Sequence, residues 1–127
     1  RWLAFVSTES GLSEVYIAPA DDTGARRRVS AAGGVAPRWR RDGRELFYLT
    51  PDHTLVAIPV AAGRELQRGS PVALFKAIRF YESRGFGGDA IYEPSPDGQR
   101  FLINRVVEDA STKPITVLLN WTALLPK

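Results

Sequence analysis

Two aspartates in this sequence could supply a catalytic pair of carboxylates, one acting as general acid and the other as general base. Asp42 and Asp97 are each followed by a glycine, and an apolar run begins after two further residues. Asp-Gly is a strong signal for a short hairpin, and an Asp in such a turn accepts hydrogen bonds from nearby backbone N–H groups. A structural turn is expected once in every repeat, whereas catalysis does not require a carboxylate in every repeat. We therefore predict no catalytic residue and interpret both pairs, Asp42 with Gly43 and Asp97 with Gly98, as structural turns.

The arginines around Trp39 could bind the phosphates of a nucleic acid while the indole ring stacks on a base. Because alternate residues of a strand point to opposite faces, Arg38 and Arg40 share one face and Trp39 occupies the other. This interleaving favours a packed tryptophan between solvated arginines. We expect no nucleic-acid partner and keep a nucleic-acid- or anion-binding surface through Arg38 and Arg40 as a less favoured alternative.

His53 is the only histidine, and it follows Pro51-Asp52 in a segment typical of an exposed turn. The chain has no cysteine, so His53 lacks the partners that a zinc site requires. A Ser-His-Asp triad would have to use the same histidine, and the Gly-x-Ser-x-Gly elbow of many hydrolases does not occur. The sequence therefore predicts no metal, no cofactor and no enzymatic activity in this chain.

Residues 76–89 form the longest segment without a clear period, and they include the glycine-rich run 85–88. Segments of this length inside a compact domain are usually functional or disordered. The run lacks the preceding strand and following helix of a nucleotide-binding loop. We expect either a loop that presents Tyr81, Arg84 and Phe86 to a partner or a disordered segment, and the sequence does not separate the two.

The two Asp-Gly segments belong to a repeat that organises the whole chain. Residues 38–49 (RWRRDGRELFYL) recur in degraded form as residues 95–103 (SPDGQRFLI), and Asp97 follows Asp42 by 55 residues. Residues 1–7 (RWLAFVS) match the second half of a further copy, with Arg1 and Arg44 separated by 43 residues. Repeats of roughly 40 to 50 residues built from short strands are typical of β-propeller blades.

Short apolar runs between turn residues predict an all-β chain, since no segment shows the apolar period of a helix. We expect a partial β-propeller of about three four-stranded antiparallel blades packed face to face, at residues 1–30, 34–75 and 90–127, with 76–89 as a long loop. The first blade lacks its innermost strand and the last lacks its outermost. The expected strands are residues 2–7, 14–18, 26–30, 35–39, 45–50, 55–60, 71–75, 90–94, 100–107 and 115–121, with 61–70 as a linker. The expected core consists of Trp2, Phe5, Tyr16, Trp39, Phe47, Leu49, Leu55, Ile58, Phe101, Ile103, Val117 and Leu119.

Length and composition limit the classes of protein that remain. The chain has 127 residues, 44% of them hydrophobic, which is enough for one domain with a core. A net charge of +3, with acidic residues interspersed, gives little indication of a nucleic-acid or membrane partner. No apolar run approaches the ~20 residues of a membrane span. The absence of methionine and the opening in mid-pattern at Arg1 lead us to expect a fragment of a longer parent chain.

Three segments together resemble the WD-like repeats of TolB-type β-propellers: residues 95–101, residues 38–48, and residues 2–7 with 14–17 (EVYI). The closing residues 114–121 (PITVLLNW) are similar to the end of the propellers attached to bacterial serine/threonine protein kinases. The resemblance implies a bacterial, non-catalytic recognition or sensor module that binds a protein or small ligand. It leaves the compartment open, with the periplasmic or other extracytoplasmic part of a membrane protein as one alternative.

A second function class is a non-catalytic propeller lid on a peptidase-type hydrolase, which would require a catalytic domain elsewhere in the parent chain. Three blades are fewer than the 4 to 8 of a closed propeller and leave open edges and apolar end faces. Either the parent chain supplies the missing blades, or two copies associate around a two-fold axis to complete a ring.

Overall fold

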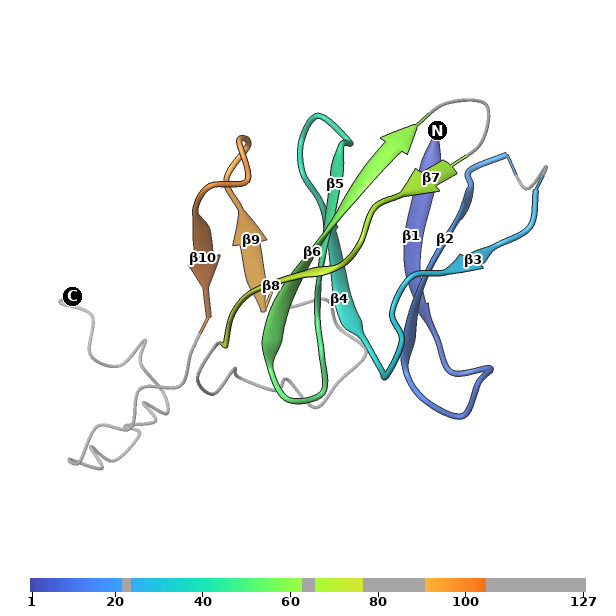
Figure 1. Ribbon diagram of the computed structural model, residues 1–127, viewed down its shortest axis with the longest axis horizontal. Helices are drawn as coiled ribbons and strands as arrows, with labels where there is room; N and C mark the ends of the chain where they lie inside the picture. The colour runs from blue at the N-terminus through green and yellow to red at the C-terminus, as the bar shows by residue number, and fades with distance from the viewer. Residues whose placement is uncertain (22–23, 63–65, 77–90, 105–127) are drawn as a thin grey trace, which may run out of the picture.

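The computed structural model describes residues 1–21, 24–62, 66–76 and 91–104, and in these ranges the chain is all-β with no helix. Its strands form three antiparallel sheets that lie side by side, none of them closed into a barrel (Figure 1). The first sheet has the order β1-β2-β3 and consists of β1 (Trp2–Ser7), β2 (Glu14–Pro19) and β3 (Arg27–Arg28). The third sheet consists of β9 (Tyr92–Pro94) and β10 (Phe101–Ile103).

The second sheet lies between the other two and contains five strands. Its meander runs through β4 (Val35–Trp39), β5 (Glu45–Leu49) and β6 (Thr54–Ala62). Two short strands, β7 (Leu66–Arg68) and β8 (Val72–Lys76), then pair with successive parts of β6. All pairings are antiparallel, as expected for strands joined by short turns.

The central strand β5 is buried on both faces, because Leu46, Phe47, Tyr48 and Leu49 are each at most 4% exposed. Alternate side chains of a strand point to opposite faces, so these four residues contribute to two different cores. Leu46 and Tyr48 belong to the core shared with the first sheet, whereas Phe47 and Leu49 belong to the core shared with the third. The second sheet is therefore the middle layer of a stack.

The first core joins the first and second sheets. Val15 and Ile17 of β2 are fully buried there, and Trp2 and Trp39 pack at its margin. Burying a side chain of this size stabilises the fold by roughly 1.5 to 3 kcal/mol. The buried members of the first core are Val15, Ile17, Val29, Leu46, Tyr48, Val56, Ile58, Val60 and Leu66.

The second core joins the second and third sheets through aromatic rings. The rings of Phe47 and Phe101 meet edge to face with their centroids 5.0 Å apart, a geometry worth about 0.5 to 1.5 kcal/mol beyond area burial. The Tyr92 hydroxyl donates a 2.8 Å hydrogen bond to the carbonyl of Ala36, at a register shift in the β4–β5 pairing. Ala36 has a φ of 52°, so this irregularity turns its carbonyl out of the ladder and toward the third sheet.

The expected strand positions are confirmed for most of the described chain, with two corrections. Residues 61–70 were expected to form a linker, but β6 continues to Ala62 and residues 66–68 form β7. The reason is a buried anchor: Leu66 is 4% exposed and packs in the first core, which holds β7 against β6. The expected third strand, residues 26–30, is reduced to the two residues of β3.

The expected core is found in large part. Tyr16, Phe47, Leu49, Leu55 and Ile58 are buried, and Trp2, Phe5, Trp39, Phe101 and Ile103 are partly buried. Val117 and Leu119 lie outside the described residues, as does the expected strand 115–121. The expected core omits several buried side chains of β5 and β6 that belong to the core shared with the first sheet, namely Leu46, Tyr48 and Val56.

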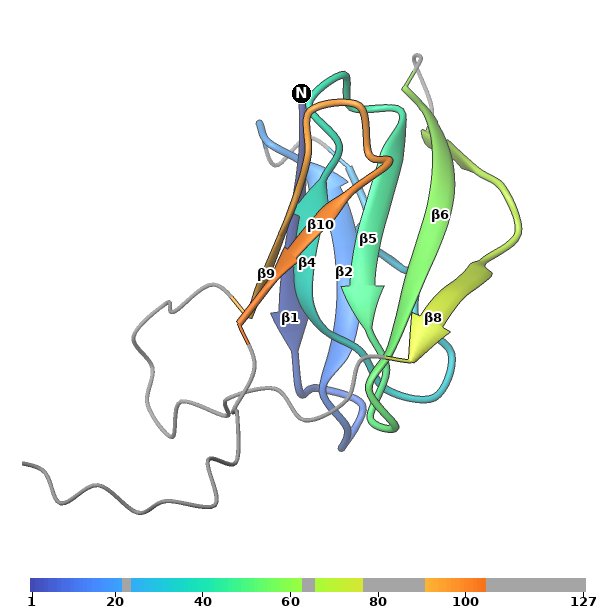
Figure 2. The same cartoon turned by 90° about the vertical axis from the view of Figure 1, so that its left-hand side faces the viewer.

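Both Asp-Gly turns lie at the same end of the stack (Figure 2). The backbone N–H of Gly43 donates to the carbonyl of Arg40 at 2.9 Å, and that of Gly98 donates to the carbonyl of Ser95 at 2.8 Å. Gly43 and Gly98 have the same φ of 71°, in the left-handed region that glycine adopts at low cost. The surroundings of the two glycines differ. A Cβ on Gly98 would meet Cδ of Arg40 at 2.8 Å and Cζ of Phe47 at 3.2 Å, whereas a Cβ on Gly43 would meet no atom within 4 Å.

This difference predicts unequal costs for the same substitution. Gly43→Ala should lower the free energy of unfolding by about 1 to 2 kcal/mol, the strain of a left-handed Ala. Gly98→Ala should cost about 1 to 3 kcal/mol more, because the added methyl group must displace Arg40 and Phe47. Urea denaturation of both variants measures the two costs. Equal losses of unfolding free energy in the two variants would contradict the close contact of Gly98 with Arg40 and Phe47.

Candidate functional site

Both turn aspartates use their carboxylates to hold their own turns. Oδ1 of Asp42 accepts hydrogen bonds from the Arg44 backbone N–H at 3.0 Å and from Nε of Arg40 at 2.8 Å, and Oδ2 accepts from Nη2 of Arg40 at 2.8 Å. Oδ1 of Asp97 accepts from the Gln99 backbone N–H at 3.0 Å and from the Ser95 hydroxyl. The two carboxylates therefore act as caps on backbone donors in equivalent positions of the repeat.

These hydrogen bonds stabilise the charged form of each carboxylate. The guanidinium of Arg40 and the N–H of Arg44 lower the pKa of Asp42 to about 2. The Ser95 hydroxyl and the Gln99 N–H likewise lower the pKa of Asp97. A general base works best with a pKa near the operating pH, so both aspartates are poorly suited to that role at neutral pH.

Arg38 and Arg40 are each paired with carboxylates. Nε of Arg38 lies 3.5 Å from Oε2 of Glu93, which links β4 to β9, and Nη1 of Arg40 lies 2.9 Å from Oε2 of Glu45. Trp39 packs against the first core, on the opposite face from the contact of Arg40 with Gly98. The side chains of both arginines are partly buried and not fully solvated as expected. Their carboxylate partners neutralise the positive charge that would attract a phosphate group.

Tyr81, Arg84 and Phe86, the expected contacts for a partner, lie outside the described residues, which omit 77–90. The residues that flank this segment lie at the end of the stack opposite to the Asp-Gly turns. Nζ of Lys76 is 3.7 Å from Oδ2 of Asp52 in the β5–β6 turn, and the Ile91 carbonyl accepts a hydrogen bond from the Asn104 N–H at 2.9 Å. We call this the hollow end of the stack, because a surface hollow lies there.

A surface hollow of about 340 Å³ lies at this end, between the first and second sheets. Its walls combine apolar and polar side chains: Leu12, Ser13, Gly33, Gly34, Val35, Thr50, Pro51 and His53. The chain passes here from the first sheet to the second, and this path requires glycine, since a Cβ on Gly33 would meet Cγ of Pro51 at 2.6 Å. Gly33 also has a φ of 96°, and the Gly34 N–H donates to the Ser13 carbonyl at 2.7 Å.

His53 lines this hollow from a strained backbone position. Its φ is 65°, a left-handed value that costs a residue with a side chain roughly 1 to 2 kcal/mol. The turn is held by Asp52, which accepts hydrogen bonds from the hydroxyls of Thr50 at 2.5 Å and Thr54 at 3.0 Å. These hydroxyls lower the pKa of Asp52. Strain of this kind persists only where the surroundings impose it, and it is concentrated at functional positions in proteins.

A buried carboxylate follows directly in sequence after Ser13, one of the residues that line the hollow. Glu14 is 1% exposed, and its Oε2 accepts a hydrogen bond from the Ser30 hydroxyl, while Oε1 lies 3.8 Å from Nη1 of Arg28. The Ser30 hydroxyl also accepts a 2.8 Å hydrogen bond from the Val15 N–H. Burial raises the pKa of Tyr48, and the charge of Glu14 adds to that shift. The described part of the chain contains no cluster of three or more side chains suited to a metal ion.

Sequence reasoning did not identify the hollow or the buried Glu14. No local pattern in the sequence indicates that the Gly33-Gly34 pair and the Pro51-Asp52-His53 turn meet in the fold. Glu14 begins a strand of otherwise apolar residues, which is the only signal that a carboxylate is buried there.

Comparisons with protein-family models, curated proteins and solved structures find no match for the chain. No helix long and apolar enough to cross a membrane occurs among the residues described.

The hydrogen bonds of Asp42 predict a pH-dependent contribution to stability. The pKa of Asp42 is about 2 in the folded state, below the roughly 3.9 of an unfolded chain, so its contribution is present above about pH 4 and is lost as the pH falls toward 2. Asp42→Asn should therefore destabilise the protein most at neutral pH, and the difference from wild type should shrink as the pH approaches 2. Denaturation curves across this pH range measure the difference. Gln99→Ala, which removes no titratable group, should show a constant difference, and a constant difference for Asp42→Asn would contradict the assignment.

Proposed function

We propose that the three sheets are blades of a partial TolB-type propeller and that the chain is a non-catalytic recognition or sensor module. Three features support the blade interpretation. The sheets are stacked face to face, equivalent Asp-Gly turns begin β5 of the second sheet and β10 of the third, and the second sheet contains an antiparallel meander. The sequence resemblance adds the context of a bacterial kinase or regulator, whose propeller senses a protein or small ligand.

The observation that carries the proposal is the contrast between the two ends of the stack. At the Asp-Gly end, Arg40 pairs with both Asp42 and Glu45. At the hollow end, His53 holds a strained conformation beside a cavity of about 340 Å³. Ligand sites are concave, mostly apolar and lined by a few polar groups, and the hollow end fits this description better than the Asp-Gly end.

The turn carboxylates also support the proposal of a non-catalytic role. Asp42 and Asp97 have lowered pKa values and fixed hydrogen bonds, so at neutral pH they remain charged and committed to their turns. The hollow contributes Ser13, Thr50 and His53 as polar groups, which suit hydrogen bonding to a peptide backbone or a small polar ligand.

Amide chemical-shift mapping tests this proposal. The ¹⁵N-labelled protein is titrated with a mixture of random-sequence hexapeptides and, separately, with a mixture of simple sugars and nucleotides. We expect shifts that saturate at Ser13, Gly34, Thr50 and His53, with none at Gly43 and Gly98 on the opposite end.

Two variants sharpen the result. His53→Asn should keep the fold, because Asn tolerates the left-handed conformation, and should weaken the binding of the selected probe at least tenfold. Gln99→Ala at the opposite end should leave binding unchanged. Saturable shifts confined to the Asp-Gly end would contradict the proposal, and so would turnover of a probe that is lost in His53→Asn.

A further inference from the structure

Among the described residues, no permanently charged side chain lines the hollow between the first and second sheets. The carboxylates that adjoin its lining residues in the sequence are engaged within the protein. Asp52 accepts hydrogen bonds from the hydroxyls of Thr50 and Thr54. Glu14 is 1% exposed and accepts a hydrogen bond from the Ser30 hydroxyl. A charged group of a ligand would therefore find no permanent counter-charge in these walls, and removing it from water would be costly.

Three backbone donors around the hollow are also used within the protein. The Gly34 N–H donates to the carbonyl of Ser13 at 2.7 Å. The His53 N–H donates to the carbonyl of Thr50 at 2.9 Å, and the Thr50 N–H donates to that of Thr54 at 3.0 Å. Phosphates and carboxylates bind to backbone sites through N–H groups that point at the anion. These three residues therefore offer an anion no backbone donor.

The hydroxyl of Thr50 is almost fully used by its own turn. It accepts a hydrogen bond from the Thr54 N–H at 3.0 Å and donates one to Oδ1 of Asp52 at 2.5 Å. A hydroxyl has one proton and two lone pairs, so Thr50 retains a single lone pair for a ligand. Ligands with many acceptor atoms, such as nucleotides, match this wall poorly.

The apolar side chains of the hollow are, in contrast, open to solvent. Leu12 is 59% exposed in the connection from β1 to β2, and Val35 is 37% exposed at the start of β4. They line the same hollow from different sheets, together with the exposed Pro51. A cavity of about 150 Å³ can hold a benzene ring. The hollow, at about 340 Å³, therefore has room for a leucine or phenylalanine side chain and part of the adjoining backbone.

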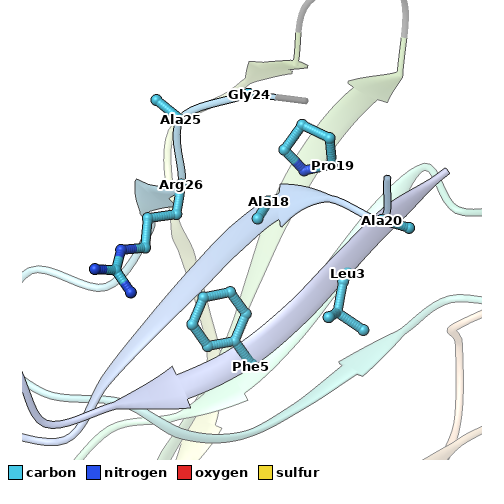
Figure 3. Close-up of a pocket in the computed structure, with 8 residues that line it drawn as sticks. All are labelled: Leu3, Phe5, Ala18, Pro19, Ala20, Gly24, Ala25 and Arg26. Carbon is cyan, nitrogen blue, oxygen red and sulfur yellow. The ribbon is translucent and has the colours of Figure 1, made fainter. Parts of the chain in front are cut away.

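A larger depression of about 650 Å³ lies over β1 and β2, where Leu3, Phe5 and Arg26 are among the residues that line it (Figure 3). Its chemistry differs, because Nη2 of Arg26 lies 2.8 Å from Oε2 of Glu9 and brings an ion pair to its wall. Its described lining belongs entirely to the first sheet and to the connection between β2 and β3. Only the smaller hollow combines uncharged walls from two sheets.

We infer that the hollow binds an uncharged apolar side chain, of leucine or phenylalanine size, that is presented by an extended peptide segment of a partner protein. The inference rests on the function proposed above and narrows its ligand to this class. Because the hollow opens at the surface, the peptide backbone can cross it while the side chain is inserted. Burial of the inserted side chain against Leu12, Val35 and Pro51 supplies the affinity.

Peptides that differ at one position test the inference. The probes are acetylated and amidated Gly-Ser-X-Ser-Gly peptides in which X is leucine, phenylalanine, serine, aspartate or lysine. They are titrated into the full ¹⁵N-labelled chain. We expect the leucine and phenylalanine peptides to cause saturable amide shifts at Leu12, Ser13, Gly34 and Val35. The other three should bind at least about tenfold more weakly, because they bury no large apolar side chain. N-acetyl-leucinamide, which lacks the flanking peptide, should also bind about tenfold more weakly than the leucine peptide.

Variants of one exposed leucine provide matched controls. Leu12→Asn should weaken the binding of the leucine peptide about fivefold or more, because it replaces an apolar wall with an amide. Leu12→Met keeps an apolar side chain of similar size and should bind as the wild type does. Leu102→Asn makes the same exchange on the third sheet, where Leu102 is 78% exposed, and should leave binding unchanged. Both leucines are exposed, so all three variants should retain the circular dichroism of the wild type.

The outcomes separate this inference from the function proposed above. Equal binding of the serine, aspartate or lysine peptide at the hollow would overturn the inference alone, as would binding there of only a sugar or nucleotide. Equal binding of N-acetyl-leucinamide would also overturn it, because a free apolar molecule would then be the ligand. Saturable shifts at Leu3 and Phe5 in place of the hollow would contradict the site itself. If no peptide, sugar or nucleotide shifts any residue of the hollow, both the inference and the proposed function fail.

Discussion

The stack depends on the two-sided burial of β5. Its residues alternate between two cores, so the first and third sheets are held on opposite faces of the same five-residue strand. A shift of one residue in the pairing of β5 would exchange Leu46 with Phe47 and place each in the wrong core. The Asp42 turn prevents this, because its hydrogen bonds with Arg40 and Arg44 fix the residue at which β5 begins. The register of one hairpin therefore determines how three sheets meet.

The same constraint gives the two ends of the stack different properties. Gly98 packs on the side chain of Arg40, so the two turns are in contact, and Arg40 is in turn paired with Asp42. At the hollow end, the crossing at Gly33-Gly34 and the turn at Asp52 approach each other without filling the space between the sheets. His53, which has a left-handed backbone conformation, lines this space, and it is here that we propose recognition takes place.

Much of this architecture could be predicted from local sequence patterns. The Asp-Gly pairs identified two hairpins. The apolar runs, together with the short charged segment 26–30, identified nine of the ten strands in the described chain, because turn chemistry and strand burial act over a few residues. The strand β7 was missed because Leu66 stands alone between polar residues and is held only by a distant core. The hollow was missed for the same reason, since Ser13, Gly33 and Pro51 come together only through the stacking of sheets. The contact residues Tyr81, Arg84 and Phe86 remain a prediction.

Nuclear Overhauser effects between the sheets measure whether the two faces of β5 belong to two separate cores. Proton spectra should connect the ring of Phe47 to that of Phe101, and should connect Leu46 to Val15 and Ile17 in the other core. We expect these two sets of contacts to remain separate, with no signal from Leu46 to Phe101. Contacts from Leu46 and Phe47 to the same sheet, or the absence of any signal between Phe47 and Phe101, would contradict a stack that is organised on the two faces of β5.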